Sequence, residues 1–72
     1  MMVVRFTQEH LTLDDLQNAL SAVETQAGAI KAGVILDFAA VNELVGAWSL
    51  HLAMIVYFAR QLRKPIRAAL PR

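Results

Sequence analysis

The sequence predicts an α/β fold in which three short strands alternate with two helices, in the order β-α-β-α-β. Two short apolar runs, Met2 to Phe6 and Val34 to Phe38, have the β-branched and aromatic composition of strands. Longer stretches with apolar residues at helical spacing follow each of them. Strands that alternate with helices are typical of parallel sheets. We therefore expect one domain over residues 1–72, a small unit with a short, mostly parallel sheet.

The first predicted helix begins after Thr12 and ends near Gln26. Thr12 is a suitable N-cap residue, and Asp15 three positions later completes an approximate capping box. Asp14 and Asp15 lie in the first turn, where the helix dipole favours anions. Because capping explains both carboxylates, we assign them no acid–base or metal-binding chemistry. The next segment, Val34 to Phe38, is almost continuously apolar, which indicates a strand buried on both faces.

The second predicted helix covers Asn42 to Lys64 and is apolar around most of its circumference. On a helical wheel at about 100° per residue, one apolar stripe stands out. It consists of Leu44, Trp48, Leu52, Ile55, Ala59 and Leu62, widened by Ala47, Met54 and Phe58. We expect Trp48 to be buried against the sheet or across a subunit contact. Pro65 ends the helix, and Ile66 to Leu70 is the third predicted strand.

The apolar run from Leu44 to Ala59 raises the question of a membrane span. Its 16 residues reach roughly 24 Å as a helix, and a bilayer requires ~20 residues. The run contains His51 and stops at Arg60, although acids before it and bases after it do fit a positive-inside arrangement. A helix covered by its own sheet and by a second chain explains the run better. A membrane-associated subunit with residues 44–59 in or on the bilayer stays open as an alternative.

The composition excludes several classes of site. The 72 residues include no cysteine, so disulfides and thiolate zinc sites are absent. The 57% hydrophobic content exceeds the roughly 45–50% of ordinary soluble domains, which predicts apolar surface that meets another molecule. All six acids precede Leu44, and five bases follow it: Arg60, Arg63, Lys64, Arg67 and Arg72. A nucleic-acid interface on this segment is a further alternative, with weak binding because few phosphates are neutralised.

Titratable residues do not form a catalytic or metal-binding pattern. His51 has no histidine, cysteine or acid within one helical turn, so we predict a hydrogen-bonded or interface histidine. Asp37 follows the central strand, where α/β proteins place ligand groups, but no glycine-rich turn or second acid accompanies it. We predict that Asp37 caps a turn and that His10 lies in a solvated loop. The sequence thus predicts no enzyme, no cofactor and no small-molecule substrate.

The order of these pieces resembles the STAS domain family, typified by bacterial anti-sigma-factor antagonists. The stretches that carry the resemblance are LTLDDLQNAL, GVILDFAAV and KPIRAALP, which together span nearly the whole chain. The resemblance implies a protein-binding regulatory module without catalysis. In that family the module is often switched by phosphorylation of a serine or threonine at the start of the second helix.

The chain departs from the family pattern at this switch. Aligned on Leu36-Asp37, the switch motif falls on residues 45–48, Val-Gly-Ala-Trp, which offer no hydroxyl group. Ser49 is the nearest candidate phosphosite, and we expect it one turn inside the helix. The first antiparallel strand typical of the family is missing as well. We therefore expect a reduced STAS-like fold that lacks the regulatory chemistry.

The sequence as a whole predicts a non-enzymatic protein–protein interaction module that acts through an apolar helix and sheet surface. It would work as a homodimer or as a subunit of a larger complex. The predicted interface consists of Leu44, Trp48, Leu50, His51, Met54, Tyr57 and Phe58. Met1 to Phe6 lacks the features of a secretory signal, so we expect a cytoplasmic protein.

Overall fold

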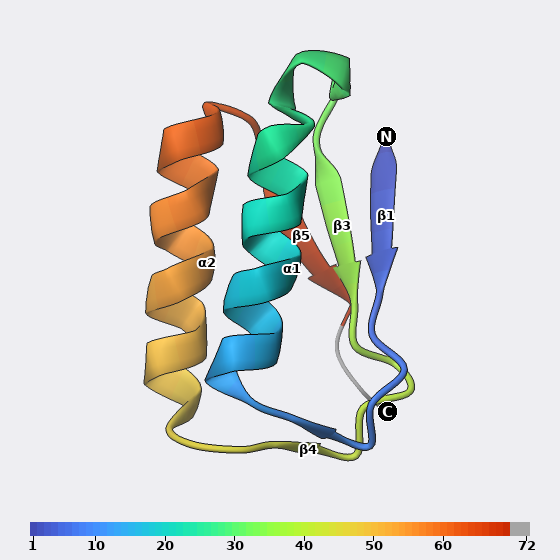
Figure 1. Ribbon diagram of the computed structural model, residues 1–72, viewed down its shortest axis with the longest axis vertical. Coiled ribbons are helices and arrows are strands. Elements are labelled where there is room, and N and C mark those ends of the chain that lie inside the picture. Colours follow the sequence, from blue (N-terminus) through green and yellow to red (C-terminus); the bar gives the residue numbers. More distant parts are fainter. Residues whose placement is uncertain (70–72) are drawn as a thin grey trace.

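The computed structural model describes residues 1–69 and confirms the α/β architecture. Three strands form a parallel sheet in the order β1-β3-β5, namely β1 (Met2–Arg5), β3 (Val34–Asp37) and β5 (Ile66–Ala69). Helices α1 (Leu13–Thr25) and α2 (Trp48–Leu62) pack side by side on one face of this sheet (Figure 1). The third strand was predicted to reach Leu70, which lies outside the described residues.

Two very short strands add a second, two-stranded parallel sheet, β2 (His10–Leu11) with β4 (Glu43–Leu44). Each follows a strand of the main sheet and precedes a helix, so the order strand, short strand, helix occurs twice along the chain. The short sheet lies beyond the carboxyl ends of β1 and β3, near the start of both helices (Figure 1). A 3-10 turn, η1 (Ala27–Ala29), follows α1.

Helix α1 begins as the sequence predicts. The Thr12 hydroxyl accepts a hydrogen bond from the Asp15 backbone N–H at 3.1 Å, and the Asp15 carboxylate accepts one from the Thr12 N–H at 3.1 Å. This reciprocal capping box satisfies donors that an uncapped first turn would leave free. Leu16, Leu20 and Val23 are buried on the sheet side, and the opposite side of the helix is polar.

The core lies between the two helices and the sheet. The rings of Phe6 and Phe38, which follow β1 and β3, stack with centroids 4.9 Å apart. Partly buried residues of β1 and β5, namely Met2, Val4 and Ile66, pack against the core. The buried residues that fill it come from β2, α1, β3, α2 and the connecting segments: Phe6, Leu11, Leu16, Leu20, Val23, Ile30, Val34, Leu36, Phe38, Val41, Ile55, Phe58 and Leu62.

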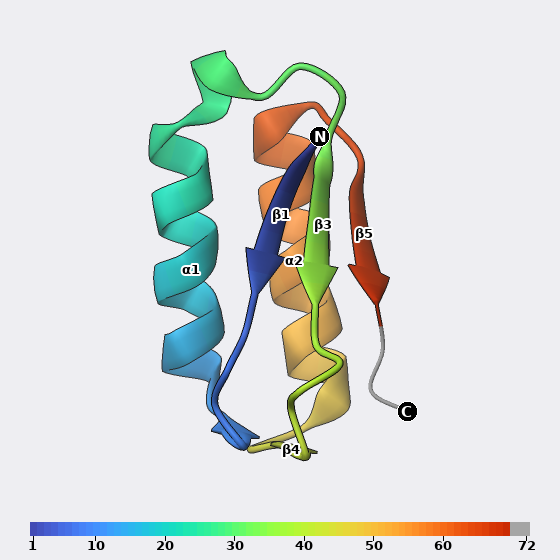
Figure 2. The same ribbon diagram turned by 90° about the vertical axis from the view of Figure 1, so that its right-hand side faces the viewer.

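The expectation that β3 is buried on both faces is wrong. Val34 and Leu36 are fully buried beneath the helices, whereas Ile35 and Asp37 on the other side are only partly covered. The strand order runs in one direction, so two crossovers of the same hand place both helices on the same face. Figure 2 shows the other face, which no described segment covers.

Helix α2 differs from its prediction in both start and rotation. It begins at Trp48 instead of Asn42, because the intervening residues form β4 and a turn at Gly46, whose φ is +102°. Its buried side consists of His51, Ile55, Phe58 and Leu62. Trp48 and Leu52 are each 43% exposed, so Trp48 does not pack against the sheet, and its burial in a subunit contact stays a prediction. Almost every side of this helix is apolar, and the sequence pattern therefore did not define which side faces the sheet.

Candidate interaction surface

Large apolar side chains are concentrated on the outer side of α2 and the turn before it. Met1 and Val3 aside, all the strongly exposed large hydrophobic residues within residues 1–69 lie there: Val45, Trp48, Leu50, Leu52, Val56 and Tyr57. Their exposed fractions run from 42% at Val45 to 58% at Tyr57. We call this set the α2 face. An exposed apolar surface of this kind marks an interaction site more often than an isolated exposed leucine does.

The neighbouring helix has the opposite character. The exposed positions of α1 are mostly polar, among them Asp14, Gln17, Asn18, Ser21 and Glu24. The two helices pack side by side on the same sheet, so the difference is not a consequence of their place in the fold. It comes from the residues that each helix presents to solvent.

A groove between α1 and α2 borders the α2 face. One hollow of about 430 Å³ is lined by Leu13, Gln17, Leu50, Ala53, Met54, Tyr57 and Phe58. A second hollow of about 470 Å³ shares Gln17, Tyr57 and Phe58 with it and adds Ser21, Glu24 and Thr25. The groove is therefore apolar near the start of α2 and more polar toward the end of α1.

The predicted interface residues divide into three groups. Trp48, Leu50 and Tyr57 are exposed on the α2 face, whereas Leu44 and Met54 are half-buried. His51 and Phe58, which the prediction included, are 1% and 8% exposed and belong to the chain's own core. The predicted interface did not include Leu52 and Val56, which are both exposed on the α2 face. Leu52 was placed on the stripe expected to be covered, and Val56 was assigned to no side.

His51 anchors the first turn of α2. Its Nδ1 lies 2.9 Å from the Ala47 carbonyl oxygen, so Nδ1 carries the proton and donates to this acceptor. This confirms the predicted hydrogen-bonded histidine. Nε2 is buried and has no hydrogen-bond partner within the described residues. The indole of Trp48 lies partly over the imidazole, with ring centroids 6.4 Å apart. His51 thus links the core to the first residue of the α2 face.

Asp37 has a structural role, as predicted. Its Oδ1 accepts a hydrogen bond from the Ala39 N–H at 3.0 Å, which caps the turn after β3. Its Oδ2 lies 3.3 Å from Nε of Arg5 on the neighbouring strand. Both side chains lie on the open face of the sheet, since the paired positions Arg5 and Asp37 alternate with positions that are more buried, Val4 in β1 and Leu36 in β3.

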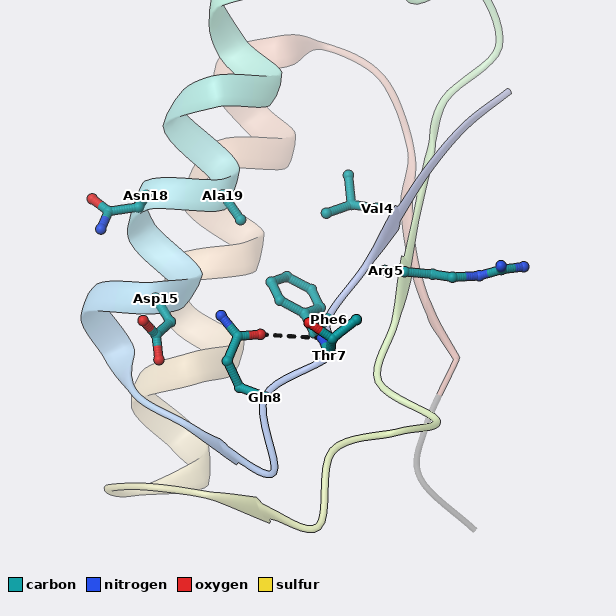
Figure 3. A pocket seen from close by; sticks show the side chains of 8 residues that line it. All are labelled: Val4, Arg5, Phe6, Thr7, Gln8, Asp15, Asn18 and Ala19. Carbon is teal, nitrogen blue, oxygen red and sulfur yellow. Dashed lines mark hydrogen bonds between the residues drawn. The ribbon is translucent and has the colours of Figure 1, made fainter.

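A polar hollow of about 450 Å³ lies between β1 and the start of α1. Figure 3 shows the side chains that line it, with Asp15 and Asn18 from α1 and Gln8 from the segment after β1. Two of the polar side chains near it serve the local backbone: Asp15 caps α1, and the Gln8 side-chain oxygen accepts from the Thr7 N–H at 3.2 Å. Arg5 points away from the hollow (Figure 3). Within residues 1–69, three metal-binding side chains are nowhere grouped together.

Comparison of the chain with protein-family models, with curated proteins and with solved structures found no match. Among the described residues, neither helix has both the length and the apolar character needed to cross a bilayer.

Ser49 is more accessible than the sequence suggested. It is the second residue of α2 and is exposed, because the helix starts six residues later than predicted. The expectation that Ser49 lies one turn inside the helix is wrong. Its N–H is one of the free donors of the first turn, and the residue before the helix, Ala47, provides no side-chain cap.

The charges of the described residues are separated between the two ends of the molecule. Acidic side chains gather where the helices begin, at Glu9, Asp14, Asp15 and Glu43. His10 and Glu43 are opposite one another in the short sheet there, with Nδ1 of His10 3.6 Å from Oε1 of Glu43. The opposite end, where α2 finishes, carries the bases Arg60, Arg63 and Lys64, with Lys31 after η1. Glu24, near the end of α1, lies at the basic end, and Arg5, Asp37 and Arg67 lie on the strands of the main sheet.

Proposed function

We propose that the chain is a non-enzymatic, cytoplasmic protein-interaction module, a STAS-like regulatory or assembly subunit that binds its partner through the α2 face. The observation that carries the proposal is the contrast between the two helices. The outer side of α2 is apolar, whereas the outer side of its neighbour α1 is polar. A helix of an isolated soluble domain normally presents a polar side to water.

The size of the α2 face supports the same proposal. Its six side chains expose on the order of 500 Å² of mostly apolar surface, near the upper end of the ~300–600 Å² typical of the largest patch on a monomer. Burying this area contributes roughly 12 kcal/mol at about 25 cal/mol per Å². Association itself costs about 4–15 kcal/mol. The area is therefore of the order that a reversible complex requires.

The arrangement of the basic residues supports a protein partner over a nucleic acid. Arg60, Arg63 and Lys64 lie at the end of α2, but Arg67 pairs with Ile35 and lies on the open face of the sheet. The bases that are close in sequence therefore divide between two surfaces. A nucleic-acid interface requires the basic side chains on one surface.

Site-specific photo-crosslinking in cells tests the proposal. A photoreactive amino acid at Leu52 of the full chain probes the α2 face, and the same amino acid at Ser21 probes the exposed side of α1 as the matched control. We expect a discrete protein adduct from position 52 and none from position 21. Equal labelling at both positions, no protein adduct, or adducts to lipid alone would each overturn the proposal.

A further inference from the structure

We infer that the α2 face binds a second copy of the same chain, with the two α2 helices packed antiparallel about a two-fold axis. The inference rests on the proposed function, because it uses the same surface and names the partner. Three properties of α2 point to it: the spacing of the residues along its outer side, their charge, and the area that they offer.

The middle of the outer side of α2 has the spacing of a helix-packing seam. Ser49, Ala53, Val56 and Arg60 follow one another at intervals of four, three and four residues, and all four are exposed. This is the a and d spacing of a coiled coil. Ser49 and Ala53 are small, which allows a second helix to approach closely. Trp48 and Leu52 flank the seam on one side, and Leu50 and Tyr57 flank it on the other.

An antiparallel arrangement fits the seam, and a parallel one does not. With the two-fold axis between Ala53 and Val56, the small Ala53 faces Val56 of the other copy, and Ser49 faces Arg60. A parallel pair would place Arg60 against Arg60 and leave Ser49 against Ser49. Like charges in contact destabilise such a pair. The antiparallel pair instead lets the guanidinium of Arg60 donate to the serine hydroxyl.

The charges at the two ends of the molecule favour the same orientation. An antiparallel pair brings the basic end of one copy, with Arg60 and Arg63, toward the acidic end of the other, with Asp14 and Glu43. The two helix dipoles also oppose one another in this orientation. A parallel pair would bring the two basic ends together.

The area is sufficient for a dimer. The 15 residues of α2 span about 22 Å, and the apolar α2 face supplies more than half of the ~800 Å² that each partner of a standard interface buries. The remainder can come from the polar rim, which includes Ser49, Arg60 and Gln61. Because the interface is isologous, the same patch serves on both copies and the assembly closes at two.

Sedimentation of the purified full chain over a concentration series tests the inference. We expect a species of twice the 8.0 kDa chain mass. Ala53→Glu places a charge at the centre of the seam and should raise the dissociation constant at least tenfold. Ala22→Glu, the matched change at an exposed position of α1, should leave it unchanged. Circular dichroism of both variants confirms that the fold is retained. A wild-type monomer, or equal effects of the two variants, would overturn the inference.

Disulfide trapping tests the orientation, and the absence of native cysteine makes it specific. The antiparallel pair predicts that the double variant Ser49→Cys/Arg60→Cys forms a covalent dimer on mild oxidation, whereas neither single variant does. Covalent dimers from both single variants would show a parallel pair and refute the proposed arrangement. A monomer in sedimentation combined with a position-52 adduct to a different protein would reject the dimer and leave the proposed function standing. A monomer without any such adduct would reject both.

Discussion

Gly33 lies where the three strands of the main sheet begin. Its carbonyl accepts a hydrogen bond from the Met2 N–H at 3.1 Å, and the next residue, Val34, donates to the Pro65 carbonyl at 3.0 Å. Its φ is +146°, a backbone conformation that residues other than glycine rarely adopt. A Cβ at this position would lie 2.7 Å from the Pro65 carbonyl oxygen. One residue without a side chain thus lets the starts of β1, β3 and β5 meet.

Replacement of this glycine should therefore be costly. We expect Gly33→Ala to lower the free energy of unfolding by about 2–4 kcal/mol, because it combines backbone strain with a clash against backbone atoms that cannot rotate away. Urea unfolding followed by circular dichroism measures the change. Gly28→Ala is the matched control, since a Cβ there meets nothing within 4 Å. If the two variants were equally stable, the close approach of Gly33 to Pro65 would be wrong.

At the same scale, the sequence predicted the core residues of α1 and only part of those of α2, where Ile55 and Leu62 of the predicted stripe are buried and Trp48 and Leu52 are not. Leu16 and Leu20 on α1 were identifiable because polar residues alternate with them at helical spacing. His51 and Phe58 were misassigned to the interface because nearly every position around α2 is apolar. Burial there is decided by the turn at Gly46 and by contacts with α1, which are tertiary features.

The two helices begin in different ways. Thr12 and Asp15 close a complete capping box at α1, whereas Ala47 precedes α2 in an extended conformation (φ −69°, ψ 131°) and offers no side-chain acceptor. The first turn of α2 is held instead by the His51 side chain, which donates to the Ala47 carbonyl. This bond uses a backbone carbonyl as its acceptor, so it provides no side-chain acceptor for the N–H groups of the first turn.

Changes at the two caps should therefore act in opposite directions. We expect Thr12→Ala to lower the free energy of unfolding by about 1 kcal/mol and Ala47→Asp to raise it by about 0.5–1 kcal/mol. Thermal unfolding at a fixed protein concentration measures both, and Ala47→Asn separates capping from the effect of charge. Loss of stability in both Ala47 variants would mean that the chain before α2 does not have N-cap geometry.

The short sheet of β2 and β4 was not predicted. Each strand has only two residues, too few for an alternating pattern, and each lies in a segment expected to be a loop or the start of a helix. Its pairing depends on the two segments being brought together by the larger sheet. The start of α2 is displaced for the same reason, because Glu43 and Leu44 belong to β4.

The whole molecule has three distinct surfaces: the apolar α2 face, the polar side of α1 and the open face of the sheet. The sequence predicted the fold class, because strand-like and helical patterns alternate along the chain. It did not predict that both helices cover the same face. This follows from the order β1-β3-β5, which depends on pairings between residues far apart in the chain. The hydrophobic content predicted an apolar surface that meets another molecule, but only the structure identifies the residues that form the exposed apolar surface.

The central position of β3 has a consequence for how the chain folds. Met2 pairs with Val34 and Val34 pairs with Ile66, so each half of the sheet joins residues about 30 positions apart, and neither half is a local hairpin. Pairings at such a separation require the closure of long loops before any contact offsets the lost entropy, which slows folding. Both pairings require β3, and a transition state without it would contain none of the main sheet.

Folding kinetics should therefore distinguish the central strand from an edge strand. We expect Leu36→Ala in β3 to slow refolding, and Val4→Ala in β1 to act mainly by accelerating unfolding. Stopped-flow measurements over a range of urea concentrations, made on protein diluted until the rates no longer depend on concentration, give both rate constants. A Leu36→Ala variant that refolds as fast as the wild type would show that the helices assemble before the sheet and that β3 is added late.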